Sequence, residues 1–221
     1  MAEVYGVKPK IFTKEWWPYF WLYYKWHTVA VLFVTMLIVM GISECAKREK
    51  YDLRLTMLGT FHAETESLIS LETALEPAIE DIDGNEEKNI DIMSLVFVDK
   101  AEYDEENFAS YIKHDSEFSD PLMQMFIYDK RELERRDAEL FLPEAFCETD
   151  EWLQPEVDED LLYYSSDGKP YAVSLKNSSI LNECGINGEN LYVLVKNDAD
   201  APKQNPKAHQ NAVITANNLI K

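Results

Sequence analysis

An α/β fold of one lobe, with a mostly parallel sheet flanked by helices and preceded by an N-terminal transmembrane helix, is predicted by two patterns in the sequence. Near the N-terminus an uncharged apolar run extends from Trp26 to Ser43. Beyond residue 50, strand-like apolar runs alternate with segments whose apolar residues recur every three or four positions. This alternation calls for a parallel sheet with right-handed crossovers.

The apolar run has the length of one membrane span. Its 18 residues would extend about 27 Å as a helix, close to the thickness of a hydrocarbon core. We place the transmembrane helix at residues 28–45. We expect it to remain uncleaved, because a bulky aromatic block precedes it where a signal peptide has a short basic region.

Residues 1–27 form the predicted cytoplasmic and interfacial segment. Four of the five tryptophans of the chain, Trp16, Trp17, Trp21 and Trp26, lie here among further aromatic residues. Indole rings favour the headgroup level of a bilayer, where one end of the ring is wet and the other apolar. These tryptophans are therefore the predicted membrane anchor, and the lipid bilayer is the predicted partner.

The charge divides the chain into a basic anchor and an acidic domain. Residues 1–50 carry 7 Lys and Arg against 4 Asp and Glu, a net charge of +3, whereas residues 51–221 carry 14 against 37, a net charge of −23. So acidic a domain repels nucleic acid and anionic lipid, and it favours solubility or cationic partners.

Flanking charges do not orient the span. Four basic residues precede it and four follow it: Lys8, Lys10, Lys14 and Lys25, then Lys47, Arg48, Lys50 and Arg54. The positive-inside rule therefore leaves both orientations open.

The first part of the domain predicts a strand, a broken helix and a second strand. Residues 51–59 alternate and end in a glycine, as a strand before a turn does. A helical stripe follows over residues 64–82, and Pro77 should break it near Glu76. Residues 81–85 resemble a calcium loop, but the glycine is misplaced, so they predict a tight turn. Residues 89–98 predict a strand covered on both faces.

The middle of the domain predicts a second helix and a third strand. A short helix is expected over residues 106–112. Asp120 and Pro121 suggest the start of a longer helix, with Leu122, Met125, Phe126 and Leu133 as its buried stripe and Arg135 and Arg136 in its last turn. Residues 138–142 then predict a strand that stops at Pro143, and residues 144–153 a short helix.

The C-terminal part predicts a hairpin, a strand and a helix. Asp167 and Gly168 mark the turn of the hairpin over residues 163–175. Residues 191–195 predict another strand, and residues 197–205 a loop. The last helix begins at Asn205 and Pro206, and its stripe is Ala208, Ala212, Ala216 and Leu219.

The order of these elements, with residues 138–142, 144–153 and the segment GKPYAVSL at residues 168–175, resembles one lobe of the type 2 periplasmic (extracellular) solute-binding proteins. The chain also resembles small single-pass membrane-anchored proteins of clostridial type. The resemblance covers residues 51–221 and implies an extracellular domain. Only about 15 residues separate Leu175 from Leu191, so the second lobe of a two-lobed binder has no room here.

The carboxyl ends of the strands are where a ligand is expected in an open α/β sheet. These ends are predicted near Gly59, Asp99, Pro143 with Glu144, and Lys176 with Asn177. The predicted ligand-binding residues at this rim are Thr60, Phe61, Ser178 and Ser179.

No residue pattern predicts catalysis, a metal or a cofactor. The histidines His62, His114 and His209 lack metal-binding spacing, and no serine lies in a nucleophile elbow. Cys147 and Cys184 are either a disulfide in an oxidising compartment or two buried thiols.

Two classes of function remain open. The first, which we favour, is a non-enzymatic binding or protein-interaction module tethered to the cell membrane by one span, with its domain outside and another membrane or surface protein as its partner. The second is an enzyme with an unrecognised active site. An inward-facing regulatory domain is the alternative if the span has the opposite orientation.

Overall fold

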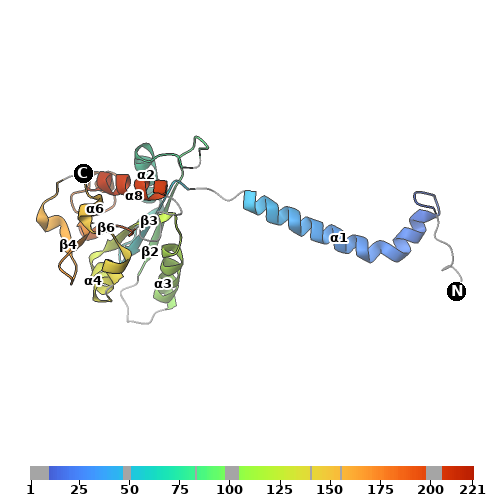
Figure 1. Ribbon diagram of the computed structural model, residues 1–221, viewed down its shortest axis with the longest axis horizontal. Helices are drawn as coiled ribbons and strands as arrows, with labels where there is room; N and C mark the ends of the chain where they lie inside the picture. Colours follow the sequence, from blue (N-terminus) through green and yellow to red (C-terminus); the bar gives the residue numbers. More distant parts are fainter. Residues whose placement is uncertain are drawn as a thin grey trace. The chain divides into compact units, whose positions relative to one another are not determined.

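The computed structural model describes residues 10–46, 51–82, 84–97, 105–139, 141–154, 156–197 and 206–221. It divides the chain into two compact units, Met1–Glu49 and Lys50–Lys221. Figure 1 shows the first unit as one long helix and the second as an α/β domain.

The first unit is built around α1 (Trp16–Ala46), a helix of 31 residues. It is long and apolar enough over Trp16–Ser43 to cross a membrane. Pro18 is tolerated because it lies in the first turn, where the backbone N–H has no acceptor within the helix. The sequence therefore supports one N-terminal helix of membrane-spanning length.

Residues 16–27 of the predicted aromatic segment and the predicted span form one continuous helix. At 1.5 Å per residue α1 is about 46 Å long, which exceeds a hydrocarbon core of about 30 Å. The surplus is the aromatic end, where Trp17, Trp21 and Trp26 are exposed. Trp16 instead stacks on Phe20, with ring centroids 4.8 Å apart. A helix that is longer than the hydrocarbon core of the bilayer would place these exposed indole rings at the level of the lipid headgroups, which is where tryptophan is enriched.

The domain contains a six-stranded mixed sheet in the order β2-β1-β3-β6-β5-β4. Three strands are parallel and form one half of it: β1 (Leu53–Gly59), β2 (Ile90–Val96) and β3 (Met123–Asp129). The other half is antiparallel: β6 (Leu191–Val195), β5 (Pro170–Ser174) and β4 (Leu162–Tyr164). The predicted parallel sheet thus describes the β2-β1-β3 half.

Helices cover both faces of this sheet (Figure 1). One face packs against α2 (Thr65–Leu75), α6 (Thr149–Trp152), α7 (Ser179–Glu183) and α8 (Pro206–Leu219). The other packs against α3 (Glu105–Phe118), α4 (Lys130–Ala138) and α5 (Phe141–Ala145). All seven residues of β3 are buried, because their side chains alternate between the two cores. β3 is thus a central strand.

Several predicted elements are confirmed. Both β1 and β2 lie within the predicted strands, and the hairpin β4–β5 turns at Gly168, which has a φ of +83°. Helix α2 ends at Leu75 and gives way to the 3₁₀ turn η1 (Glu76–Ala78), so Pro77 breaks the helix where expected. Strand β6 and helix α8 match their predictions.

The predicted helix from Asp120 to Arg136 is wrong in its first half. Met123–Asp129 is β3, and the helix α4 starts only at Lys130. The apolar residues Leu122, Met125, Phe126 and Leu133 fit a helical period, but the run MQMFIY is equally a short strand buried on both faces. Burial between β1 and β6 decides in favour of the strand.

The predicted strand over residues 138–142 is also wrong, and the single helix predicted over residues 144–153 is instead the end of α5 and the separate α6. Ala138 ends α4, and Phe141–Ala145 is the short helix α5, which buries Leu142 and Ala145. Leu142 and Ala145 lie in the same core as Leu133 of α4, so this apolar run is buried as a helix against the sheet and not as a strand within it. The four-residue α6 and the 3₁₀ turn η2 (Glu159–Leu161) follow α5.

Other differences are smaller. Helix α3 is longer than the helix predicted over residues 106–112. Strand β2 is covered on both faces as predicted, because Ile92 belongs to one core and Leu95 to the other, but as an edge strand it is only partly buried. Asp99 at the predicted rim and nearly all of the predicted loop 197–205 lie outside the described residues.

Candidate functional site

The carboxyl ends of β1 and β3 meet at one side chain, Asp129. One carboxylate oxygen, Oδ2, accepts hydrogen bonds from the backbone N–H of Thr60 at 2.6 Å and from its hydroxyl at 2.9 Å. The other oxygen, Oδ1, accepts from the backbone N–H of Glu132 at 2.8 Å and so caps α4. Asp129 thus fixes the end of β1 to the start of α4.

Gly59 is required by this arrangement. A Cβ atom at residue 59 would lie 2.6 Å from Cγ and Oδ2 of Asp129, closer than non-bonded atoms approach. The glycine therefore lets the carboxylate sit against the β1 backbone.

A cavity of about 330 Å³ opens beside this junction. This volume is at the lower end of the range for small-molecule sites. Its lining comes from the end of β1, the start of α4 and the loop before β6: Thr60, Phe61, Asp129, Lys130, Arg131, Asn187, Asn190 and Leu191.

The lining is rich in hydrogen-bond donors. Lys130 and Arg131 contribute positive charge from the first turn of α4. The Oδ1 atom of Asn187 accepts a hydrogen bond from the backbone N–H of Glu189 at 3.0 Å. The amide NH₂ group of Asn187 can therefore donate to a ligand. Asp129, the only carboxylate among the described lining residues, is already engaged by three N–H or O–H donors. The cavity therefore suits a ligand that accepts hydrogen bonds or carries negative charge.

The structure brings together two of the four predicted ligand-binding residues. Thr60 and Phe61 line the cavity, with Phe61 half-buried as an aromatic wall. Ser178 and Ser179 follow β5 at the same edge of the sheet but are not among the described lining residues. Ser178 is buried and caps α7 by accepting from the backbone N–H of Leu181 at 3.3 Å.

Sequence reasoning missed Asp129, Lys130, Arg131, Asn187 and Asn190. The pattern Asp-Lys-Arg-Glu directly after an apolar run was available, because an aspartate three residues before a glutamate marks a helix start. No local pattern indicates Asn187 and Asn190. They reach the cavity because β6 pairs with β3.

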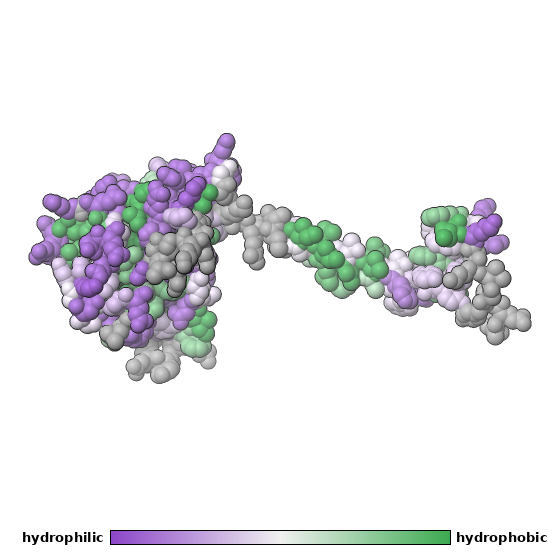
Figure 2. All heavy atoms as spheres, in the orientation of Figure 1, coloured by the Kyte–Doolittle hydropathy of each residue, from purple (hydrophilic) through white to green (hydrophobic). Residues whose placement is uncertain are grey.

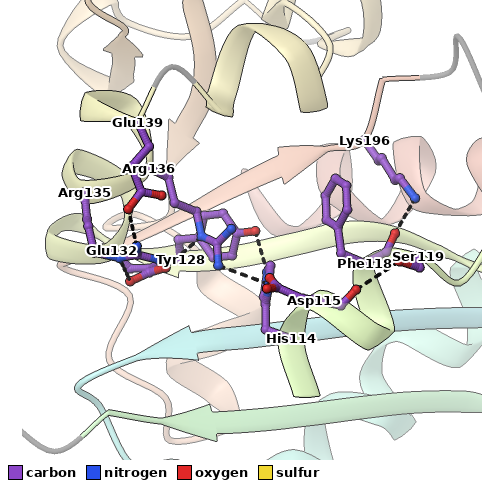
Figure 3. A network of polar contacts seen from close by, with 10 residues as sticks. All are labelled: His114, Asp115, Phe118, Ser119, Tyr128, Glu132, Arg135, Arg136, Glu139 and Lys196. Atoms are coloured by element: carbon purple, nitrogen blue, oxygen red, sulfur yellow. Dashed lines mark hydrogen bonds and ion pairs between the residues drawn. The ribbon is translucent and has the colours of Figure 1, made fainter. Parts of the chain in front are cut away.

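A second polar cluster lies within the core that α3 and α4 cover, and Figure 3 shows its side chains. His114 is fully buried, and its Nε2 lies 2.8 Å from the hydroxyl of Tyr128. Its Nδ1 lies 3.1 Å from a guanidinium nitrogen of Arg136, whose Nε donates to Glu132 at 2.7 Å. Nδ1 also lies 3.2 Å from Oδ1 of Asp115. Arg136 can only donate and the Asp115 carboxylate can only accept, so these two contacts at Nδ1 call for opposite tautomers of the ring.

Burial and charge keep this histidine neutral. Desolvation, followed by the positive charge of Arg136, lowers the pKa of His114 from 6.5 to about 4. Burial also raises the pKa of Tyr128. Glu132 carries the countercharge for both arginines, since Arg135 donates to it through two nitrogens at 3.0 and 2.7 Å. The cluster joins α3, β3 and α4 and opens into no described cavity, so its role is structural.

The remaining candidates for chemistry lie apart. His62 is exposed, and no histidine, cysteine or serine is among the described residues that line the cavity. Cys147 and Cys184 are both buried and are not bonded to each other in this structure, which agrees with the alternative of two buried thiols. Within the described ranges no group of three or more His, Cys, Asp or Glu side chains is placed to hold a metal ion.

The chain matches no protein-family model, and no curated protein or solved structure is significantly similar to it. The resemblance to one lobe of a solute-binding protein therefore stays a prediction.

Proposed function

We propose that this protein is a binding module tethered to the cell membrane by one span, with its α/β domain outside the cell. The domain binds a small ligand that carries a carboxylate or a phosphate. The carrying observation is the donor-rich cavity at the carboxyl ends of β1 and β3, the usual place for ligands in open α/β sheets.

The composition of the cavity supports an anionic rather than a neutral ligand. Lys130 and Arg131 lie at the N-terminus of α4, where the helix dipole already makes the potential positive. Phe61 offers an apolar surface beside them. A ligand with an acidic group and an adjacent ring would use both features.

Ligand titration tests this proposal. The full chain in uncharged detergent micelles is titrated with benzoate, inorganic phosphate and the neutral analogue benzyl alcohol, and binding is followed by ligand-observed NMR. We expect benzoate and phosphate to bind and benzyl alcohol not to bind. Replacing Lys130 and Arg131 by Gln should weaken benzoate roughly tenfold or more, since hydrogen bonds to charged groups contribute about 1.5–3 kcal/mol.

Lys207→Gln is the matched control, because Lys207 is an exposed lysine on α8, outside the described lining of the cavity. It should leave binding unchanged. An equal loss of benzoate affinity in both variants would mean that binding depends on the overall charge of the domain and not on the cavity, and this would refute the proposal.

The orientation needs its own experiment. With a tag after Lys221, protease added to intact cells should remove the tag. Protection in wall-stripped cells, with cleavage only after lysis, would place the domain inside and favour a regulatory role.

A further inference from the structure

Helix α3 presents an apolar pair to solvent. Its inner side packs Tyr111, His114 and Phe118 into the core. On its outer side Phe108 is 65% exposed and Ile112 54% exposed. Residues four positions apart lie on the same face of a helix, so these two side chains form one surface. Figure 2 shows hydrophobic surface at the lower right of the domain, where α3 begins.

This pair differs from the other exposed apolar side chains of the described domain. Ile69 on α2 and Tyr164 on β4 are the remaining large ones, and they lie on separate elements. Single exposed apolar residues are ordinary, whereas adjacent ones at helical spacing are typical of helix-docking surfaces.

Charge selects the kind of partner. Helix α3 carries four acidic residues against one lysine, and the domain as a whole has a net charge of −23. Asp115, one turn beyond Ile112, has a side chain that is 75% exposed. A second copy of so acidic a domain would be repelled. A cationic partner is instead attracted.

The free edge of β2 is less suited to docking. The carboxylate of Glu72 is hydrogen-bonded to the backbone of Ile92, and the hydroxyl of Ser110 donates to the carbonyl of Val96 at 3.3 Å. Side chains thus occupy part of the edge that an added strand would need.

We infer that the outer face of α3, centred on Phe108 and Ile112, docks a cationic amphipathic helix of a partner protein. Apolar side chains of that helix cover the pair, and its lysines or arginines face the carboxylates of the domain. This interaction goes beyond the proposed anion site and does not depend on it.

The test uses the full chain in uncharged detergent micelles and a fluorescent helical peptide of leucine and lysine, with fluorescence anisotropy as the readout. A peptide with glutamate in place of lysine and empty micelles give the background. We expect the lysine peptide alone to bind above background. Phe108→Ser with Ile112→Ser should weaken that binding at least tenfold.

Ile69→Ser is the matched control, because Ile69 is 55% exposed on a helix of the opposite face. It should leave peptide binding unchanged, as should the Lys130 and Arg131 double variant that tests the anion site. Equal binding by the α3 double variant and the Ile69 variant would overturn the inference. So would a dimer of the parent in sedimentation velocity that the α3 double variant abolishes, because the face would then pair two copies.

Discussion

The buried His114 should make the stability of the domain depend on pH in a defined window. Its pKa is lowered from 6.5 to about 4 in the native state. Above pH 6.5 the ring is neutral in both folded and unfolded chains. Between pH 6.5 and about 4 the unfolded state takes up a proton that the native state refuses, so the contribution of this group to stability is lost as the pH falls.

The size of this effect follows from the same two values. A tenfold change in proton affinity corresponds to about 1.4 kcal/mol, so the fall from 6.5 to about 4 corresponds to about 3 kcal/mol. The physical cause is that a protonated ring would be buried at 3.1 Å from the guanidinium of Arg136. A loss of this size is a large part of the stability of a typical domain.

The assay compares urea unfolding of the full chain in micelles with that of the His114→Gln variant, at several pH values from 7 to 4. Many carboxylates titrate in this range, but they are common to both proteins, so the difference isolates His114. The stability of the parent minus that of the variant should shrink by about 3 kcal/mol from pH 7 to pH 4. A difference that stays constant, or grows as the pH falls, would refute the lowered pKa of the buried His114. His62→Gln shows the effect of removing a histidine outside the cluster.

Three further predictions concern the fold. Gly59→Ala should destabilise the domain by about 1–3 kcal/mol in urea unfolding, because its Cβ would overlap Asp129; unchanged stability would contradict the packing of Asp129 on β1. Asn211→Ala should cost about 2–4 kcal/mol, since the buried amide bonds the backbone of Glu80 and the carbonyl of Asp52, whereas Asn218→Ala on the same helix should cost far less. Dithiothreitol should leave the Tm unchanged, because the buried Cys147 and Cys184 form no disulfide with each other in the structure, and a lower Tm on reduction would reveal one.

The sequence predicted the fold correctly where a single residue restricts the backbone to one conformation. Pro77 ends α2 because it lacks an N–H, and Gly168 turns the hairpin because it adopts a positive φ. The prediction for residues 120–138 was wrong because the apolar residues there fit both a helical stripe and a buried strand. Only the neighbouring strands β1 and β6, distant in sequence, make residues 123–129 a strand.

The dependence on contacts between distant segments also explains which residues of the candidate site were predicted. Thr60 and Phe61 were predictable, because they directly follow a strand that ends in glycine. Asp129 and Lys130 carry the helix-start pattern Asp-Lys-Arg-Glu, but the wrongly predicted helix placed them in its middle and so hid that signal. Asn187 and Asn190 belong to a loop whose position depends on the antiparallel pairing of β6 with β3, which residues near them do not encode.

The charges of α4 bear on whether the cavity binds an anion. Arg135 and Arg136 in the last turn complement the helix dipole, as does Glu132 near the start. Lys130 and Arg131 oppose it, at a cost of about 0.3–1 kcal/mol each. In a domain with 37 acidic residues against 14 basic ones, helix stability alone would favour acids at these two positions. Lys130 also lies 4.0 Å from the carboxylate of Glu134, an exposed pair that contributes little to stability. Replacing both cations by glutamine should therefore change the stability in urea by less than about 1 kcal/mol while it weakens benzoate binding. A variant that loses several kcal/mol instead would assign Lys130 and Arg131 to the fold, and unchanged benzoate binding would refute their role in the cavity.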